Sequence, residues 1–239
     1  MVLIFDCFGT IIDFKSIDFN KGLTRLWEDH FKDHCTFEDL EAYNLELFHH
    51  VENLHKEEKE MAFVRQELPL YIKKFAAKEF TMTPSDEVDF MMLCTELDNI
   101  PGIPEALAEY EKKGIKCYML SNSIYSSKAI AELLNRFGVG KYFSDVWASS
   151  DFGVVKPSKT FFDMAVKKIV EENPGESIDS LVYVGDTYES DVCGADRAGL
   201  KSIWINRKGE EDANGIATKI ISDATKLLSA TNDIAGGSL

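Results

Sequence analysis

The chain has 239 residues, of which 45% are hydrophobic, enough for one large folded domain or a core with a smaller insert. Its formal net charge of -15 opposes binding to nucleic acid or anionic membranes, so an anionic substrate must meet local cations or a metal. No stretch approaches the roughly 18 apolar residues of a membrane span, so we expect neither nucleic acid nor a membrane as a partner.

The first predicted element is a strand at residues 2–6, an apolar run that ends on Asp6 before the turn at Gly9-Thr10. From about residue 14 to 98, apolar residues recur at helical spacing instead. We expect four or five helices there and no strands. A break at residues 81–85 precedes the last helix, which Ser85 could cap.

Strands and helices alternate after Pro101-Gly102. We expect helices at 104–113, 126–137, 158–172 and 189–198, and strands at 115–121, 144–148, 180–185 and 201–205. An edge strand near 219–222, a helix ending near Ala230 and a loose tail at 235–239 complete the chain. This alternation predicts an α/β fold with a doubly wound parallel sheet. The domains are then a core of residues 1–13 and 99–239, and a helical cap of residues 14–98 over the carboxyl ends of the strands.

The five cysteines are scattered, with no CxxC pair, which is typical of reduced thiols in a cytosolic protein. The first residues lack the basic segment and apolar run of a signal peptide, so we expect a cytoplasmic location. Cys7 lies next to Asp6 and could act as a nucleophile. No histidine lies nearby in the sequence to activate it, which disfavours that role.

Four short motifs at the ends of predicted strands carry the candidate chemistry. They are Asp6 with Thr10 in FDCFGT, Ser121-Asn122-Ser123 in LSNS, Lys156 in VKPS, and Asp186 with Asp191 in VGDTYESD. Open α/β sheets bind their ligands at this edge. A hydroxyl beside backbone N–H groups can bind an oxyanion, and the lysine supplies a cation. The paired acids suit Mg²⁺.

In this order, the four motifs resemble those of the haloacid dehalogenase (HAD) superfamily, over nearly the whole chain. The resemblance implies a Rossmann-like core with an α-helical cap inserted after the first motif. It further implies Mg²⁺-dependent hydrolysis of a small phosphorylated substrate. Asp6 would attack the phosphoryl group, and water would then hydrolyse the aspartyl-phosphate. The oligomeric state stays open between a monomer and a homodimer.

The resemblance also implies a role for each site residue. The catalytic residues would be Asp6, Thr10, Ser121 and Lys156; the substrate-binding residues Gly9, Ser121, Asn122 and Lys156; and the metal ligands Asp6, the carbonyl of Phe8, Asp186 and Asp191. Two of these roles have alternatives. Thr10 either orients Asp6 or closes a turn. Asp191 either contacts the metal or lies just behind it and braces the loop.

Phe8 departs from the phosphatase pattern. Most phosphatases of this superfamily have a second aspartate there, which protonates the leaving alcohol and then activates the water. Positioned acid-base catalysis is typically worth about 10²–10⁴-fold in rate. An aromatic residue at this position is typical of the 2-haloacid dehalogenases, in which halide leaves without a proton. A metal-independent dehalogenase is therefore one alternative, and a catalytically weak phosphate-binding protein is another.

Other residues favour the phosphatase. The dehalogenases need no metal, and they carry an uncharged polar residue where Asp186 stands and a tyrosine where Phe162 stands. They also place a halide-binding arginine early in the cap, whereas Arg25 and Arg65 lie at other spacings. With Phe8 in place, we expect substrates with good leaving groups, such as acyl or aryl phosphates, rather than sugar or nucleoside monophosphates.

Overall fold

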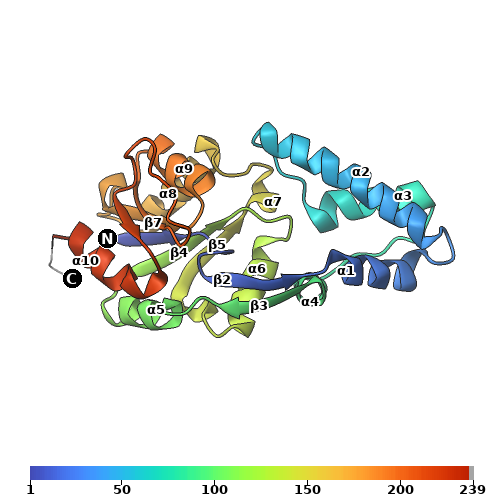
Figure 1. Ribbon diagram of the computed structural model, residues 1–239, viewed down its shortest axis with the longest axis horizontal. Helices are drawn as coiled ribbons and strands as arrows, with labels where there is room; N and C mark the ends of the chain where they lie inside the picture. Colours follow the sequence, from blue (N-terminus) through green and yellow to red (C-terminus); the bar gives the residue numbers. More distant parts are fainter. Residues whose placement is uncertain (237–239) are drawn as a thin grey trace.

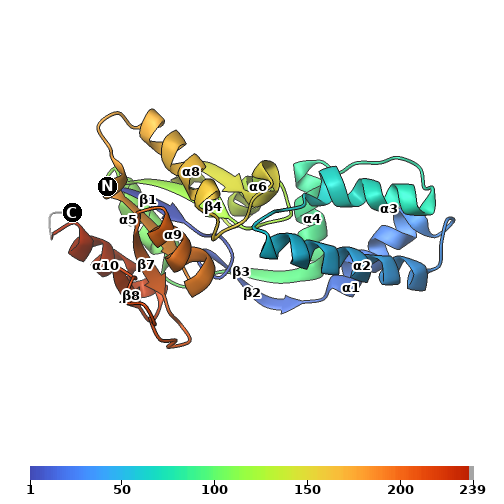
Figure 2. The same cartoon turned by 90° about the horizontal axis from the view of Figure 1, so that it is seen from above.

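The computed structural model describes residues 1–236 and is built on a six-stranded parallel sheet (Figures 1 and 2). The strand order is β5-β4-β1-β6-β7-β8. The bounds are β1 Val2–Phe5, β4 Lys116–Ser121, β5 Phe143–Ala148, β6 Leu181–Gly185, β7 Lys201–Ile205 and β8 Lys219–Ile221. All neighbouring pairs in this sheet are parallel, which confirms the predicted α/β fold class.

Helices cover both faces of the sheet, as the alternation of side chains along β1 requires. Leu3 and Phe5 pack toward one face, against α5, α6 and α10, while Val2 and Ile4 pack toward the other, against α8 and α9. The bounds are α5 Ile103–Lys112, α6 Ser127–Arg136, α8 Lys159–Glu172, α9 Cys193–Arg197 and α10 Leu227–Ile234. A short helix, α7 Ser149–Phe152, follows β5 and was not predicted.

A helical segment lies beyond one end of this sheet (Figures 1 and 2). It comprises α1 Phe19–Leu26, the π-helical turn Trp27–Phe31, α2 Phe37–Lys56, the π-helical turn Phe63–Glu67, α3 Leu68–Phe75 and α4 Pro84–Cys94. The segment has an apolar core of its own around Leu40, Leu68 and Tyr71. None of the helices in residues 1–236 has the length and apolarity to cross a membrane.

The start of α4 corrects one prediction. Thr83, rather than Ser85, caps the helix: its hydroxyl accepts the N–H of Asp86, and the Asp86 carboxylate accepts the N–H of Thr83. Such a capping box needs an acid three residues after the cap, which Thr83 has and Ser85 lacks. Ser85 therefore lies within the first turn.

The expectation of no strands between residues 14 and 98 was wrong. β2 Ile12–Ile17 pairs with β3 Thr95–Asn99 as a two-stranded antiparallel ribbon, with Asp13 opposite Asp98. The two strands are far apart in the sequence. Their side chains are mostly polar and exposed, and the alternation at Ile12 and Phe14 is too short to mark a strand. The ribbon carries the chain into and out of the helical segment. We propose that the core and cap divide within it.

The other elements deviate by small amounts. The helix expected at 189–198 is a π-helical turn, Tyr188–Val192, followed by α9. The last helix continues past Ala230 to Ile234. Of the tail expected to be loose, residues 237–239 lie outside the described residues.

Candidate active site

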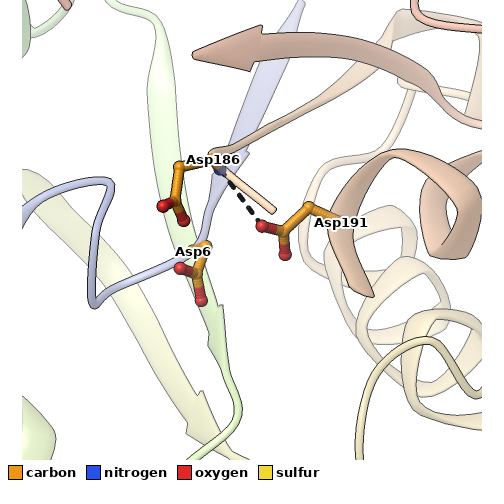
Figure 3. Close-up of side chains that lie close together, drawn as sticks. All are labelled: Asp6, Asp186 and Asp191. Carbon is orange, nitrogen blue, oxygen red and sulfur yellow. Dashed lines mark hydrogen bonds between the residues drawn. The ribbon is translucent and has the colours of Figure 1, made fainter. Parts of the chain in front are cut away.

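The sheet order brings the four predicted motifs together. β1 lies between β4 and β6, so Asp6, Ser121 and Asp186 stand at the carboxyl ends of three adjacent strands. The Asp6 N–H extends the ladder by donating to the carbonyl of Val184. Carboxylate oxygens of Asp6, Asp186 and Asp191 lie within 4.8 Å of one another (Figure 3).

Lys156 lies at the centre of this cluster. Its ammonium donates to Asp6 Oδ1 at 2.6 Å, to Asp191 Oδ1 at 2.7 Å and to the Tyr183 hydroxyl at 2.8 Å. A lysine has three N–H donors, so all of them are used here. Burial lowers the pKa of Lys156, but the charges of Asp191 and Asp6 outweigh this effect and raise it overall. The lysine is therefore a permanent cation.

Asp6 is buried, with 6% of its surface exposed. Burial raises its pKa above the ordinary range and the charge of Asp191 adds to this effect, while Lys156 offsets part of it. The two oxygens of Asp6 differ, because Lys156 bonds only Oδ1. Asp6 Oδ2 accepts no hydrogen bond from any residue in 1–236, so it is available to a ligand or a reacting atom.

Asp191 is fully engaged in holding its surroundings. Its Oδ2 accepts the backbone N–H of Asp186 at 3.1 Å (Figure 3) and that of Thr187 at 2.9 Å, and its Oδ1 accepts from Lys156. Gly185 leaves room for it, since a Cβ there would lie 2.4 Å from Asp191 Cγ. This geometry favours the brace over direct metal contact.

Asp186 is held more loosely. Thr10 donates to Asp186 Oδ1 at 3.5 Å, so the Thr10 hydroxyl contacts this acid rather than Asp6. Arg207 lies 3.8 Å from Oδ2, and the Trp204 indole donates to the Asp186 carbonyl. Gly9 allows this approach because it has a φ of +83° and no side chain; a Cβ would lie 2.4 Å from Asp186 Oδ2.

Ser121 is the last residue of β4 and is fully buried in the site. The Asn122 side chain bonds the backbone of Lys156: it accepts the Lys156 N–H at 2.7 Å and donates to the Lys156 carbonyl at 3.0 Å. It thereby joins the second motif to the third. The Ser123 hydroxyl accepts the Tyr125 N–H, as in a turn. Within residues 1–236, the backbone N–H of Asn122 donates to no protein group.

Phe8 packs on Phe14 of β2 with ring centroids 5.1 Å apart. An apolar pair of rings therefore occupies the position two residues after Asp6. Cys7, the alternative nucleophile, is buried, and burial raises its thiol pKa well above the usual range. A thiol in that state is unreactive.

Two site residues were missed by the sequence predictions. Tyr183 reads as a core residue of the strand 180–185, but its hydroxyl donates to the Leu120 carbonyl and accepts from Lys156. Arg207 lies in the loop after β7 and donates to the Gly9 carbonyl at 2.8 Å and to Asp13 at 3.0 Å. Neither belongs to a motif, although an arginine directly after a strand end is a usable signal.

Several known proteins are similar to this chain. Pyrimidine 5'-nucleotidase YjjG of Escherichia coli (strain K12) is 34% identical over 125 residues, covering 52% of this chain and 51% of that protein. The 2-haloacid dehalogenase of Pseudomonas syringae pv. Tomato DC3000 aligns over 98% of this chain and 99% of its own, with a TM-score of 0.69 and 19% identity. The HAD-hydrolase YfnB of Bacillus subtilis, bound to magnesium, covers 97% and 98%, with a TM-score of 0.60 and 22% identity.

These similarities differ in what they establish. The chain spans about half the length of the curated relatives that it matches. The two structures share its fold. The model of haloacid dehalogenase-like hydrolases matches residues 1–199, which include all four motifs. The chain therefore belongs to the haloacid dehalogenase-like hydrolases.

Proposed function

We propose that the protein is a Mg²⁺-dependent phosphohydrolase that acts on a small phosphorylated metabolite through an aspartyl-phosphate on Asp6. One observation carries this proposal: the carboxylate of Asp186 lies beside Asp6, and its only side-chain contacts within residues 1–236 are long ones, to Thr10 at 3.5 Å, Thr187 at 3.4 Å and Arg207 at 3.8 Å, which a bound cation could replace. A metal-independent dehalogenase has no use for that acid. YjjG, which shares 34% identity over part of the chain, is named as a nucleotidase, and this supports phosphoester chemistry.

The donor set fits Mg²⁺, which prefers a few carboxylate oxygens and retains several waters. Asp6, Asp186 and the Phe8 carbonyl would hold the ion, and Asp191 would fix the loop behind them through the N–H groups of Asp186 and Thr187. When bound, the ion neutralises charge on the phosphoryl oxygens. The magnesium bound by YfnB agrees with this assignment.

The chain's own residues then account for the reaction. Asp6 Oδ2 attacks phosphorus, the bond from phosphorus to the leaving oxygen breaks, and that oxygen takes the electron pair. Lys156 favours the ionised form of the Asp6 carboxylate, which is the form that attacks, by pairing with Oδ1 at 2.6 Å. The hydroxyl of Ser121 and the N–H of Asn122 bind phosphoryl oxygens. Water hydrolyses the aspartyl-phosphate, which releases phosphate and restores Asp6.

Leaving-group chemistry sets the expected substrate class. The Phe8 and Phe14 rings replace the usual proton donor with an apolar pair, so the leaving oxygen receives no proton from that position. Acyl and aryl phosphates tolerate this because their leaving groups are stable as anions. An aryl group would also pack against the two rings.

The dehalogenase alternative lacks its halide-binding arginine. Arg25 pairs with Asp29 at 2.7 Å, on its own helical face. Arg65 pairs with Asp151 at 2.7 Å and donates to the Ser150 carbonyl. Both guanidinium groups lie at exposed positions against protein carboxylates and contact none of the four site motifs in the described residues.

A substrate panel with Mg²⁺ or with EDTA tests the proposal. It contains acetyl phosphate, p-nitrophenyl phosphate, sugar phosphates, a pyrimidine nucleoside monophosphate and 2-chloropropionate. We expect phosphate release that EDTA abolishes, fastest with the first two compounds. Chloride release that survives EDTA would replace the proposal with dehalogenation. Fastest release from the nucleotide would overturn the leaving-group argument alone.

A further inference from the structure

The segment that joins α2 to the following π-helical turn, residues 57–62, lies against the core. The Glu60 N–H donates to the Gly153 carbonyl at 3.1 Å, and the Val155 N–H donates to the Glu58 carbonyl at 3.2 Å. The Phe63 N–H donates to the Ile124 carbonyl at 2.9 Å. These bonds bring the helical segment onto the loops that follow β4 and β5, which also carry Ser121 and Lys156.

Glu60 is buried at this contact, with 5% of its surface exposed. Its Oε2 accepts the hydroxyl of the fully buried Ser149 at 2.6 Å, and its Oε1 lies 2.9 Å from His55 Nε2. Burying a carboxylate is costly unless it is hydrogen-bonded, and Glu60 meets this condition through Ser149, His55 and the backbone N–H of Met61. Its contact with Ser149 is the one that reaches the core.

Ser149 links Glu60 to the turn at residues 121–123, which we propose binds phosphate. Its oxygen accepts the backbone N–H of Ser123 at 2.8 Å, and the Ser150 N–H donates to the Ser123 carbonyl at 3.1 Å. A serine hydroxyl has one proton. When that proton is directed at Glu60, a lone pair of the Ser149 oxygen is directed at the backbone N–H of Ser123. The alternative acceptor is the Ser123 carbonyl, at 3.2 Å.

We propose that Glu60 is a positioning residue: it orients Ser149, which holds the Ser121–Ser123 turn in the conformation that binds the phosphoryl group. The inference rests on the proposed phosphohydrolase function. Glu60 comes from the helical segment and Ser121 from the sheet. The phosphate pocket is therefore complete only when the helical segment contacts the core. Glu60 itself touches neither substrate nor Asp6.

The test compares Glu60→Ala, Ser149→Ala, the double variant and Glu60→Gln, with Glu57→Ala as the matched control. Glu57 lies in the same segment, and within residues 1–236 its side chain makes only an exposed pair with Lys59. The probes are inorganic phosphate as an inhibitor and amide hydrogen exchange of the peptide that contains Ser123. The exchange readout requires no turnover.

We expect each single alanine variant to weaken phosphate inhibition about tenfold, raise KM more than it lowers kcat, and speed Ser123 exchange about tenfold. The double variant should match either single variant, because both remove the same contact. Glu60→Gln keeps an acceptor for Ser149 and should recover most of the affinity. Glu57→Ala should behave like the unmodified protein.

Unchanged exchange and unchanged phosphate inhibition in Glu60→Ala would overturn the inference, as would additive effects in the double variant. If Glu60→Ala does not fold, Ser149→Ala and Glu60→Gln decide by the same two readouts. Absence of phosphate release from the unmodified protein on every substrate would instead contradict the proposed function. The exchange measurement separates these two failures.

Discussion

The carboxyl edge of the sheet and the helical segment bury charged groups in opposite ways. At the sheet edge, the ammonium of Lys156 lies between Asp6 and Asp191, so each buried acid has a cation within 2.7 Å. In the helical segment, Glu60 and Glu67 are both buried. Among the described residues, the only cation that faces them is the half-exposed His55, which contacts Glu60. A buried cation stabilises the acids at the sheet edge, whereas the buried acids of the helical segment are unfavourable in their ionised form.

Glu67 shows that cost most clearly. Burial and the charge of Glu60 raise its pKa from 4.5 to about 7, against a smaller opposing effect of His55. Its carboxylate accepts no hydrogen bond from any residue in 1–236. A buried acid without donors favours its protonated form. The two regions should therefore respond differently to substitution and to pH.

Removing the nucleophile should have the largest effect, and only at the sheet edge. Asp6→Asn should lower phosphate release at least about 10⁴-fold, because no other group forms the covalent intermediate. Its affinity for inorganic phosphate should persist or increase, since a negative charge beside the anion is gone. A phosphate-release assay measures the turnover, and inhibition by inorganic phosphate measures the affinity. Residual turnover near the original rate would mean that Asp6 is no nucleophile.

Removing the central cation should break the balance of the edge. Lys156→Ala leaves the buried carboxylates of Asp6 and Asp191 without their shared cation, and we expect a loss of about 3–5 kcal/mol in the free energy of unfolding. Urea unfolding measures it. Lys159→Ala is the control, because Lys159 forms an exposed pair with Asp163 and its loss should change stability little. Equal effects would show that burial of the pair is unimportant.

The helical segment should respond to pH through Glu67. Between pH 4.5 and about 7, the folded state binds a proton that the unfolded state releases, so stability falls as pH rises through this window. The gap corresponds to roughly 3 kcal/mol. Asp6, whose pKa is also raised, contributes to the fall in the same window, so Glu67→Gln should make the fall smaller without removing it and should be the more stable form at pH 8. The exposed Glu41→Gln, on α2, should keep the whole fall. Urea unfolding at several pH values would refute the prediction if the two variants gave the same slope.

Restoring an acid beside Asp6 should have the smallest effect. Phe8→Asp should raise turnover of alkyl phosphate esters by roughly 10- to 100-fold, because the leaving oxygen then receives a proton. Turnover of p-nitrophenyl phosphate should change much less. Phe8→Leu, which removes the ring without adding an acid, is the control. Equal gains on both substrates would contradict the argument from leaving groups.

Much of the fold could be predicted because its signals are local. The apolar run before Asp6 and the alternation after Gly102 each mark an element within a few residues. The motifs around Ser121, Lys156 and Asp186 follow strands, so parallel topology alone predicts that they meet.

The remainder depends on contacts between distant residues. Glu60 and Ser149 are 89 positions apart, and nothing near either one indicates the other. Tyr183 looks like any aromatic residue of a central strand until its hydroxyl is seen next to Lys156. The β2–β3 ribbon consists of polar strands that become ordered by pairing with each other. Such features require the tertiary structure.

The ribbon also bears on how this chain can be modified. Since Asp13 lies opposite Asp98, the helical segment begins and ends at neighbouring points, about 5 Å apart as in any antiparallel pair. The entropy lost on closing a loop grows only slowly with its length, by about 0.6 kcal/mol for each doubling. An insert of another length at this point should therefore change the loop-closure entropy little, and its main cost is the loss of the contacts that residues 58–63 and α4 make with the core. The β2–β3 ribbon is therefore the point at which one insert could replace another.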